Sequence, residues 1–337
     1  MTRLRRVDCA SPGLTRRRCG RGFTYLDERG RSLRDAPTLE RIRGLAIPPA
    51  WQDVWICPDP NGHLQAVGTD AAGRRQYLYH SRWRARRDRE KFDTMVAFAR
   101  RLPALREAVD ELIDAEGLTK DRVLALGVRL LDRGFFRVGG EEYAKENGSY
   151  GLATLRKEHV TLEGPDSVVF DYVGKAGKRH VQRIVDLDIH RVVRELKRRR
   201  GAGAALLAYK ERRWVAVRSD EINAFIKELA GPEFSAKDFR TWHATVLAAI
   251  AVGVAATATS ENARARAVRR AVAEVAHYLG NTPAVCRASY IDARIFDRYR
   301  AGETIADAIE KVAWEGGQDA PPPMHAVEGA VLGLLDR

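Results

Sequence analysis

The stretch L-G-N-T-P-A-V-C-R-A-S-Y, residues 279–290, is the one around which the interpretation of the chain is built. Thr282, followed by a proline, predicts the N-cap and first turn of a helix. Val285 and Ala288 are expected to face a core, with Tyr290 about two turns further along. A lone tyrosine near a helix end is most often a half-buried core residue. Tyr290 can also present its phenol oxygen to a partner, which makes it a candidate nucleophile.

Length and charge restrict the classes of partner. The chain has 337 residues, enough for about two domains. It carries 58 Lys plus Arg against 45 Asp plus Glu, a formal net charge of +13. This excess indicates a nucleic acid or an anionic membrane surface, with a generic basic surface as the alternative. The most apolar stretch, residues 246–256, is too short to span a bilayer, which disfavours a membrane partner.

The cysteines and the N-terminus bear on the compartment. Cys9, Cys19, Cys57 and Cys286 show no metal-ligand spacing, so we expect reduced thiols and no metal site. The N-terminal region contains no apolar run of the kind that is typical of a signal peptide. We therefore expect a cytoplasmic protein.

The first 90 residues are rich in strand and turn signals. Residues 51–58 alternate as a strand does, and Asn-Gly at 61–62 predicts a hairpin. Residues 73–87 then interleave aromatics with arginines, and on a strand Tyr77 and Tyr79 share one face. This pattern suits a surface that lies on a phosphate backbone. The candidate DNA-contacting residues are Gln76, Tyr77, Tyr79 and His80. The alternative is a solvated basic edge strand with aromatic packing beneath.

Helical patterns dominate from about residue 89. Apolar residues from Phe92 follow helical spacing, Pro103 is expected to break the helix, and the pattern then resumes. A further helix over 123–131 leads to G-F-F-R-V-G-G, residues 134–140. Arg137 there has apolar and glycine neighbours, and burying a guanidinium costs several kcal/mol unless an anion meets it. Arg137 is a candidate phosphate ligand; the alternative is a structural pair with Glu141 or Glu142.

Residues 167–185 predict a hairpin with Lys175 and Lys178 at its tip. A lysine there could donate a proton to a leaving oxygen, although a solvated turn lysine is the ordinary case. Asp186 and Asp188 could form a metal-binding pair, but we prefer Asp188 as a helix N-cap.

A capping box at Ser235 and Asp238 opens the next helix, on which Arg240 and His243 share one face. An alanine-rich helix is expected after residue 261, and it leads directly to Asn281 in the stretch quoted first. Its apolar stripe is Val268, Val272, Val275 and Leu279.

The ordered set Arg137, Lys175, Arg240, Asn281 and Tyr290 carries a family resemblance. F-F-R-V-G-G-E-E-Y, V-G-K, F-R-T-W-H-A-T and L-G-N-T-P-A-V-C-R-A-S-Y, in this order, resemble the type IB DNA topoisomerases, in particular their compact bacterial, poxvirus-like branch. R-G-F-T-Y, I-P-P-A-W and R-Q-Y-L-Y-H near the N-terminus also look like that branch. The resemblance covers most of residues 1–310.

The resemblance implies a mechanism. Arg137 and Arg240 would bind the scissile phosphate, Lys175 would protonate the leaving 5′ oxygen, and Tyr290 would form a 3′-phosphotyrosyl link. Many family members have histidine where this chain has Asn281, whose neutral amide is expected to make a weaker oxyanion contact. We expect relaxation of supercoiled duplex DNA by a monomer located with the chromosome. No cofactor, ATP or metal ion is expected, and no G-x-x-x-x-G-K-[ST] phosphate loop is present in the sequence.

The expected fold is α+β, of the topoisomerase IB and tyrosine recombinase type. Residues 1–90 would form a small β-rich DNA-clamp domain, 91–314 a larger, mainly helical catalytic domain, and 315–337 a linker and short tail that is dispensable for the chemistry. One alternative is a tyrosine recombinase or integrase, which typically has H-x-x-R where this chain has K-D-F-R at 237–240, and a helical N-terminal domain. Another alternative is a non-enzymatic basic DNA-binding protein, which explains the charge but not the ordered set.

Overall fold

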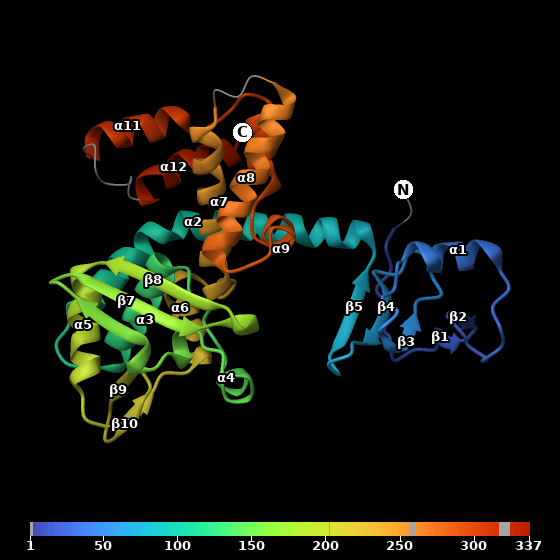
Figure 1. Cartoon of the computed structure of the whole chain (residues 1–337), viewed down its shortest axis with the longest axis horizontal. Helices are drawn as coiled ribbons and strands as arrows, with labels where there is room; N and C mark the ends of the chain where they lie inside the picture. The colour runs from blue at the N-terminus through green and yellow to red at the C-terminus, as the bar shows by residue number, and fades with distance from the viewer. Residues whose placement is uncertain (1–2, 202, 257–259, 317–323) are drawn as a thin grey trace. The chain divides into compact units, whose positions relative to one another are not determined.

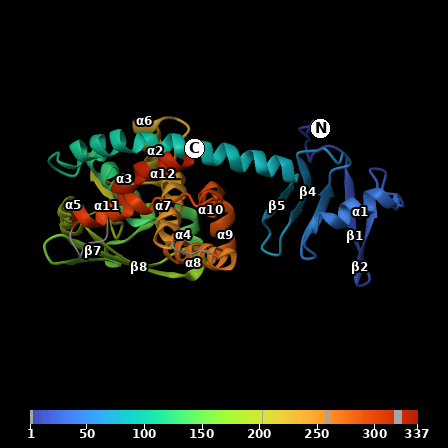
Figure 2. The ribbon, with the colours of Figure 1, turned by 90° about the horizontal axis from the view of Figure 1, so that it is seen from above.

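The computed structural model describes residues 3–201, 203–256, 260–316 and 324–337. The chain forms two compact units, Met1–Lys91 and Phe92–Arg337. The first unit, blue in Figures 1 and 2, is built on a sheet, and the second is built mainly from helices. This organisation confirms the predicted α+β class, in which a small β-sheet domain precedes a larger, mainly helical one.

The first unit contains an antiparallel sheet in the order β2-β1-β3-β4-β5. Its elements are β1 Leu14–Cys19, β2 Gly22–Leu26, α1 Ala36–Gly44, β3 Gln52–Ile56, β4 Leu64–Thr69 and β5 Arg75–Tyr79. The loop that contains Asn61 and Gly62 joins β3 to β4, which pair antiparallel, so the predicted hairpin is confirmed. Ile42 of α1 packs with Ile56 and Ala66 of the sheet, and this contact forms the core of the unit.

The second unit combines helices with two small sheets. Its helices are α2 Ser81–Ile113 (which begins in the first unit), α3 Lys120–Gly134, α4 Glu141–Asn147, α5 Leu187–Arg198, α6 Ser219–Ala230, α7 Ala236–Val254, α8 Glu261–Leu279, α9 Pro283–Ser289, α10 Ala293–Arg300, α11 Ala306–Gly316 and α12 Met324–Leu335. Its strands are β6 Val160–Glu163, β7 Ser167–Val173, β8 Arg179–Val185, β9 Ala208–Lys210 and β10 Trp214–Ala216. Short 3₁₀ turns lie at η1 Leu152–Thr154, η2 Lys157–His159 and η3 Lys175–Gly177.

Packing of these elements follows the apolar patterns of the sequence. β7 and β8 pair antiparallel along their whole length, which confirms the hairpin predicted over 167–185. α3 and α5 pack against this sheet, and α7 lies beside α8 (Figure 1). The predicted apolar stripe of α8 is confirmed, because all its members are buried: Val268, Val272, Val275 and Leu279.

The expectation that Pro103 breaks a helix is wrong, because α2 runs through it without interruption. Pro103 is exposed, whereas Leu102, Leu105 and Val109 on either side of it are buried in one core. An internal proline costs about 3 kcal/mol, and burying each large aliphatic side chain returns about 1.5–3 kcal/mol. Tertiary packing therefore outweighs the local preference.

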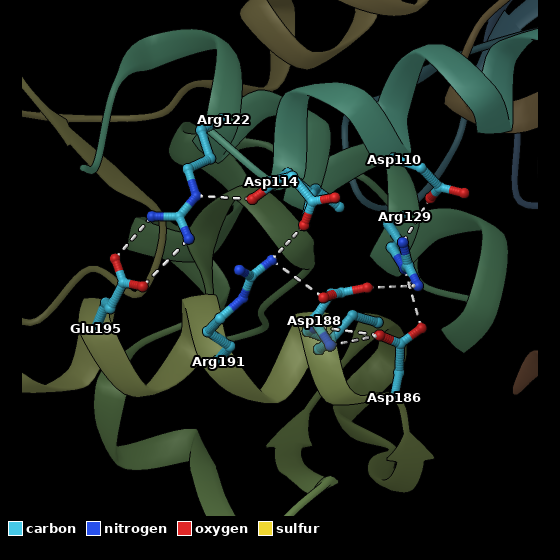
Figure 3. Close-up of polar contacts among 10 residues, drawn as sticks. Asp110, Asp114, Arg122, Arg129, Asp186, Asp188, Arg191 and Glu195 are labelled. Atoms are coloured by element: carbon cyan, nitrogen blue, oxygen red, sulfur yellow. Dashed lines mark hydrogen bonds and ion pairs between the residues drawn. The ribbon is translucent and has the colours of Figure 1, made fainter. Parts of the chain in front are cut away.

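The N-cap of α5 is Asp186, not Asp188 as predicted. The Asp186 Oδ1 accepts from the amides of Asp188 at 3.1 Å and Ile189 at 3.0 Å. Figure 3 shows both carboxylates directed at Arg129 of α3, at 2.9 Å from Asp186 and 3.3 Å from Asp188. The cap lies at Asp186 because the first helical residue is Leu187, so Asp188 already belongs to the first turn of the helix. The two carboxylates thus join α5 to α3.

Candidate active site

The connection from α8 to Tyr290 is short and fixed by local hydrogen bonds. α8 ends at Leu279, and its C-cap Gly280 has a φ of 64° that lets the chain reverse direction. The Thr282 hydroxyl oxygen accepts from the Val285 amide at 3.3 Å, so the predicted N-cap of α9 is confirmed. Tyr290 follows the last turn of α9, and its amide donates to the Cys286 carbonyl at 2.9 Å.

The prediction that Val285 and Ala288 face a core is wrong. Val285 is 48% exposed and Ala288 is exposed as well, whereas Cys286 is fully buried. A helix of 7 residues is too short for an apolar stripe to define its inner face. The single buried side chain of α9 in the described structure is the Cys286 thiol, whose pKa burial raises to about 11 against the opposing effect of Arg240.

The Tyr290 phenol lies among two guanidinium groups. Arg137 Nη1 donates to the phenol oxygen at 3.4 Å, and the Arg240 guanidinium carbon lies 5.5 Å from the centre of the Tyr290 ring. Burial by itself would raise the pKa of the phenol. The hydrogen bond from Arg137 and the charge of Arg240 outweigh burial, so the pKa of Tyr290 lies below its ordinary value. The phenolate, the nucleophilic form, is thereby favoured.

Arg240 is a buried cation held by backbone carbonyls. Its Nη2 donates to the Leu279 carbonyl at 2.8 Å, and its Nη1 donates to the Phe135 carbonyl. Burial, and then the charge of Arg137, lower the pKa of Arg240 to about 10, so it remains charged at neutral pH. Its Nε has no hydrogen-bond partner within the described part of the chain. An anion beside Arg240 would meet a positive charge that no carboxylate of the described residues neutralises.

Arg137 and Asn281 are in direct contact. Arg137 Nη2 donates to the Asn281 side-chain oxygen, while the buried Asn281 Nδ2 has no partner among the residues that the structure describes. The alternative of a pair between Arg137 and Glu141 is not observed. The Glu141 carboxylate instead accepts from the amide of Ser219 at 2.8 Å and from its hydroxyl at 3.2 Å.

Two glycines explain how the loop that carries Arg137 is positioned. A Cβ added at Gly151 would lie 2.5 Å from the Gly139 Cα, so the loop packs backbone to backbone against the residues before η1. The Leu152 amide donates to the Arg137 carbonyl at 2.8 Å across this contact. The backbone of Arg137 is therefore fixed on both sides.

Lys175 is placed at the edge of this group. It begins the exposed turn between β7 and β8 and lines a cavity of about 230 Å³ with Arg137, Ser149 and Tyr150. The structure therefore joins Arg137, Arg240, Asn281 and Tyr290 by contacts, and relates Lys175 to Arg137 through the cavity.

His243 lies outside this group. Its Nε2 is 3.4 Å from the Asp132 carboxylate. Two side chains near the site were not predicted, Tyr172 and His180. They are cross-strand partners on β7 and β8, and their pairing could have been found by counting outward from the predicted turn.

The candidate DNA-contacting residues of the first unit divide between the faces of the edge strand β5. Tyr77 and Tyr79 are exposed and stacked, with ring centres 6.2 Å apart and planes at 16°, so their predicted common face is confirmed. Gln76 alternates to the other face, where its Nε2 donates to Asp70 at 2.9 Å. His80 follows the strand and accepts from the Arg82 amide at 3.1 Å.

Within the described ranges, no three or more His, Cys, Asp or Glu side chains are grouped so that they could hold a metal ion. None of the described helices combines the length and the apolar character needed to cross a bilayer.

Comparisons with known proteins agree along most of the chain. The family described as "Eukaryotic DNA topoisomerase I, catalytic core" matches residues 80–314, and "Bacterial DNA topoisomerase IB, N-terminal domain" matches residues 22–70. DNA topoisomerase 1B of Acanthamoeba polyphaga mimivirus is 29% identical over 294 residues, which cover 83% of this chain and 85% of that protein. DNA topoisomerase 1 of Rabbit fibroma virus is 29% identical over 171 residues, 46% of this chain and 52% of that protein. DNA topoisomerase 1B of Vaccinia virus (strain Copenhagen) is 27% identical over 150 residues, 43% of this chain and 48% of that protein.

Proposed function

Because the chain belongs to the type IB DNA topoisomerase family, we propose that it relaxes supercoiled duplex DNA by cutting and resealing one strand through a 3′-phosphotyrosyl intermediate at Tyr290, without ATP or a metal ion. The observation that carries this proposal is the contact of the Tyr290 phenol with Arg137, beside the buried and carbonyl-held Arg240.

The proposed cleavage is an in-line displacement at phosphorus. The Tyr290 phenolate oxygen forms a bond to phosphorus as the bond to the 5′ oxygen breaks, and the leaving oxygen takes a proton from Lys175. A tyrosine ordinarily titrates near 10, so its lowered pKa increases the phenolate fraction at neutral pH. Resealing is the reverse reaction, in which the free 5′ hydroxyl attacks the phosphotyrosyl ester.

Negative charge grows on the phosphate oxygens during both steps. Arg137 and Arg240 supply permanently charged donors, and each donor held ready for developing charge is typically worth about 2.7–4 kcal/mol. The buried Asn281 Nδ2, which has no partner among the described residues, would serve as a neutral donor to the same oxygens once DNA is bound. These groups would stabilise the transition state without a divalent cation.

The same chemistry explains why no nucleotide is needed. One phosphodiester is exchanged for another ester of phosphoric acid, so the energy of the broken bond is kept in the covalent intermediate. Between the two steps, rotation of the broken strand would release supercoils. We further propose that the protein acts as a monomer and that residues 1–90 contact DNA through Tyr77 and Tyr79.

Plasmid relaxation in EDTA, with no ATP, tests the proposal as a whole. We expect the wild type to relax a supercoiled plasmid and Tyr290→Phe to lose both relaxation and the covalent adduct trapped by detergent. Tyr290→Phe should keep salt-sensitive DNA binding, because it leaves the basic surface intact. Tyr278→Phe, at an exposed tyrosine of α8, is the matched control and should relax DNA normally. Relaxation by Tyr290→Phe at the wild-type rate would reject the assigned nucleophile.

A further inference from the structure

His180 of β8 lies between the two segments that carry Lys175 and Asn281. It pairs across the hairpin with Tyr172 of β7, and their rings are stacked, with centres 5.4 Å apart and planes at 18°. Tyr172 in turn stacks on the buried Phe136 at 5.9 Å, so the His180 ring is supported from the core.

Two glycine backbones contact the imidazole directly. A Cβ added at Gly174 would lie 2.6 Å from His180 Cδ2, and one added at Gly280 would lie 2.3 Å from His180 Cε1. Gly174 immediately precedes Lys175, and Gly280 immediately precedes Asn281. One ring therefore fills the space between the turn with the proposed proton donor and the turn with the proposed oxyanion donor.

Hydrogen bonds also hold the lysine turn. Inside the turn, the Gly174 amide donates to the Lys178 carbonyl at 2.7 Å. Between the segments, Lys178 Nζ donates to the Gly280 carbonyl at 3.5 Å, in an exposed and long hydrogen bond. The turn thus has a defined shape of its own, but His180 provides its packed contact with the residues beside Asn281.

The ring is held in its neutral form. Burial lowers the pKa of His180, and the charges of Arg240, Arg137 and Lys178 lower it further. A neutral imidazole packs against glycine backbone without adding a cation to a site that already concentrates positive charge.

We propose that His180 is a positioning residue that holds the Lys175 turn at the distance from the scissile phosphate at which the lysine can protonate the leaving 5′ oxygen. This inference rests on the proposed function. A displacement of about 1 Å in a reacting group can cost about 10²-fold in rate, so loss of the ring is expected to slow protonation without removing the lysine.

The test compares two leaving groups in single-turnover cleavage. The substrates are duplexes with a cleavage site mapped on plasmid DNA, carrying either oxygen or sulfur at the 5′ bridging position. A thiolate leaves without protonation, because thiols titrate near 8.5. We expect His180→Ala to cleave the oxygen substrate about 10²-fold more slowly than wild type and the sulfur substrate within about threefold of wild type. His180→Phe retains a flat ring against Tyr172 and should stay within about tenfold of wild type on oxygen.

Lys175→Ala separates failure of the inference from failure of the proposed chemistry. It should show the same selective rescue by sulfur. The positioning role is wrong if sulfur rescues Lys175→Ala but His180→Ala slows cleavage of both substrates equally, or slows cleavage of neither substrate. If Lys175→Ala itself slows both substrates equally, the lysine is not the proton donor and both proposals fall. Should His180→Ala not fold, as judged by its thermal melt, His180→Phe decides, because a loss above about 10²-fold on both substrates would contradict the inference.

Discussion

Substitution of Arg106 by methionine should strongly destabilise the second unit. Arg106 of α2 joins α3 to α12: its Nε donates to Asp132 at 2.8 Å and its Nη1 donates to Glu328 at 2.6 Å. Both carboxylate side chains are only 9% exposed. Trp242 of α7 donates to the same Glu328 carboxylate at 3.0 Å. One guanidinium therefore bridges two buried carboxylates on elements far apart in sequence.

The magnitude follows from leaving those carboxylates without their cation. Removing one partner of a buried pair costs about 3–5 kcal/mol, because the remaining charge stays desolvated. For a unit of this size that corresponds to a fall in Tm of about 6–20 °C. Arg106→Met retains most of the aliphatic volume, so the loss is electrostatic rather than a cavity effect. Urea unfolding followed by circular dichroism would measure the free energy difference.

The matched control is Arg101→Met, on an exposed arginine of the same helix, for which the change in the free energy of unfolding should be within about 0.5 kcal/mol.

The pH dependence of stability gives a second check. Burial would raise the pKa of Asp132, but hydrogen bonds from His243 and Arg106 hold it well below its ordinary value. In wild type this stabilisation is present above the unfolded pKa, about 3.9, and is lost only as the pH falls through the lower folded pKa.

In Arg106→Met the buried Asp132 carboxylate loses that stabilisation, and its protonation removes the cost of keeping an unpaired charge buried. The free energy difference between wild type and variant should therefore shrink as the pH falls from 7 toward about 4. A variant as stable as Arg101→Met at pH 7, or a difference that grows on acidification, would refute the reasoning.

Further outcomes follow from the site and the C-terminal helix. The rate of single-turnover cleavage should rise with pH and reach a plateau below about pH 10, since the pKa of Tyr290 is lowered. Arg137→Ala should shift the start of this plateau to higher pH. A plateau that begins at the same pH in the variant would contradict the assigned hydrogen bond. Asn281→His should cleave at least as fast as wild type in the same assay, and a collapse in rate would show a role that histidine cannot fill. Truncation before Met324 should leave little cooperative unfolding in urea, because each aliphatic side chain lost is worth about 1.5–3 kcal/mol against a typical total of 5–15 kcal/mol; a truncated protein with the wild-type midpoint would disprove this. The buried side chains removed are Val327, Val331, Leu334 and Leu335.

Local signals in the sequence were sufficient for many of the elements. Thr282 followed by proline, and Ser235 three residues before Asp238, each predicted a helix start, because capping satisfies amides within one turn of the cap. The hairpin over 167–185 was likewise predicted from two β-rich runs around a glycine-containing turn, and the stripe of α8 from helical spacing. These features depend on neighbours in sequence, and the same neighbours are present in any fold.

The errors arose where tertiary packing decides. Pro103 stays helical because its neighbours are buried on both sides, and α9 is oriented by Cys286 because one buried contact suffices for so short a helix. The segment 317–323, which is part of the linker and short tail predicted over 315–337, lies outside the described residues. Beyond it, α12 packs in the core of the second unit through Val331 and its neighbours.

The site itself shows what sequence order alone could not supply. Order suggested that Arg137, Arg240 and Asn281 act together, but it contained no hint of their partners. In the structure Arg240 donates to the carbonyls of Phe135, the C-cap of α3, and Leu279, the last residue of α8. Helix C-termini carry partial negative charge, so they can hold a guanidinium in place without neutralising it as a carboxylate would. A carboxylate in the same position would compete with the phosphate and would raise the pKa of Tyr290. The carbonyls at the ends of two helices therefore fix the position of Arg240 without forming an ion pair. The charge of Arg240 remains available to the phenol and to DNA.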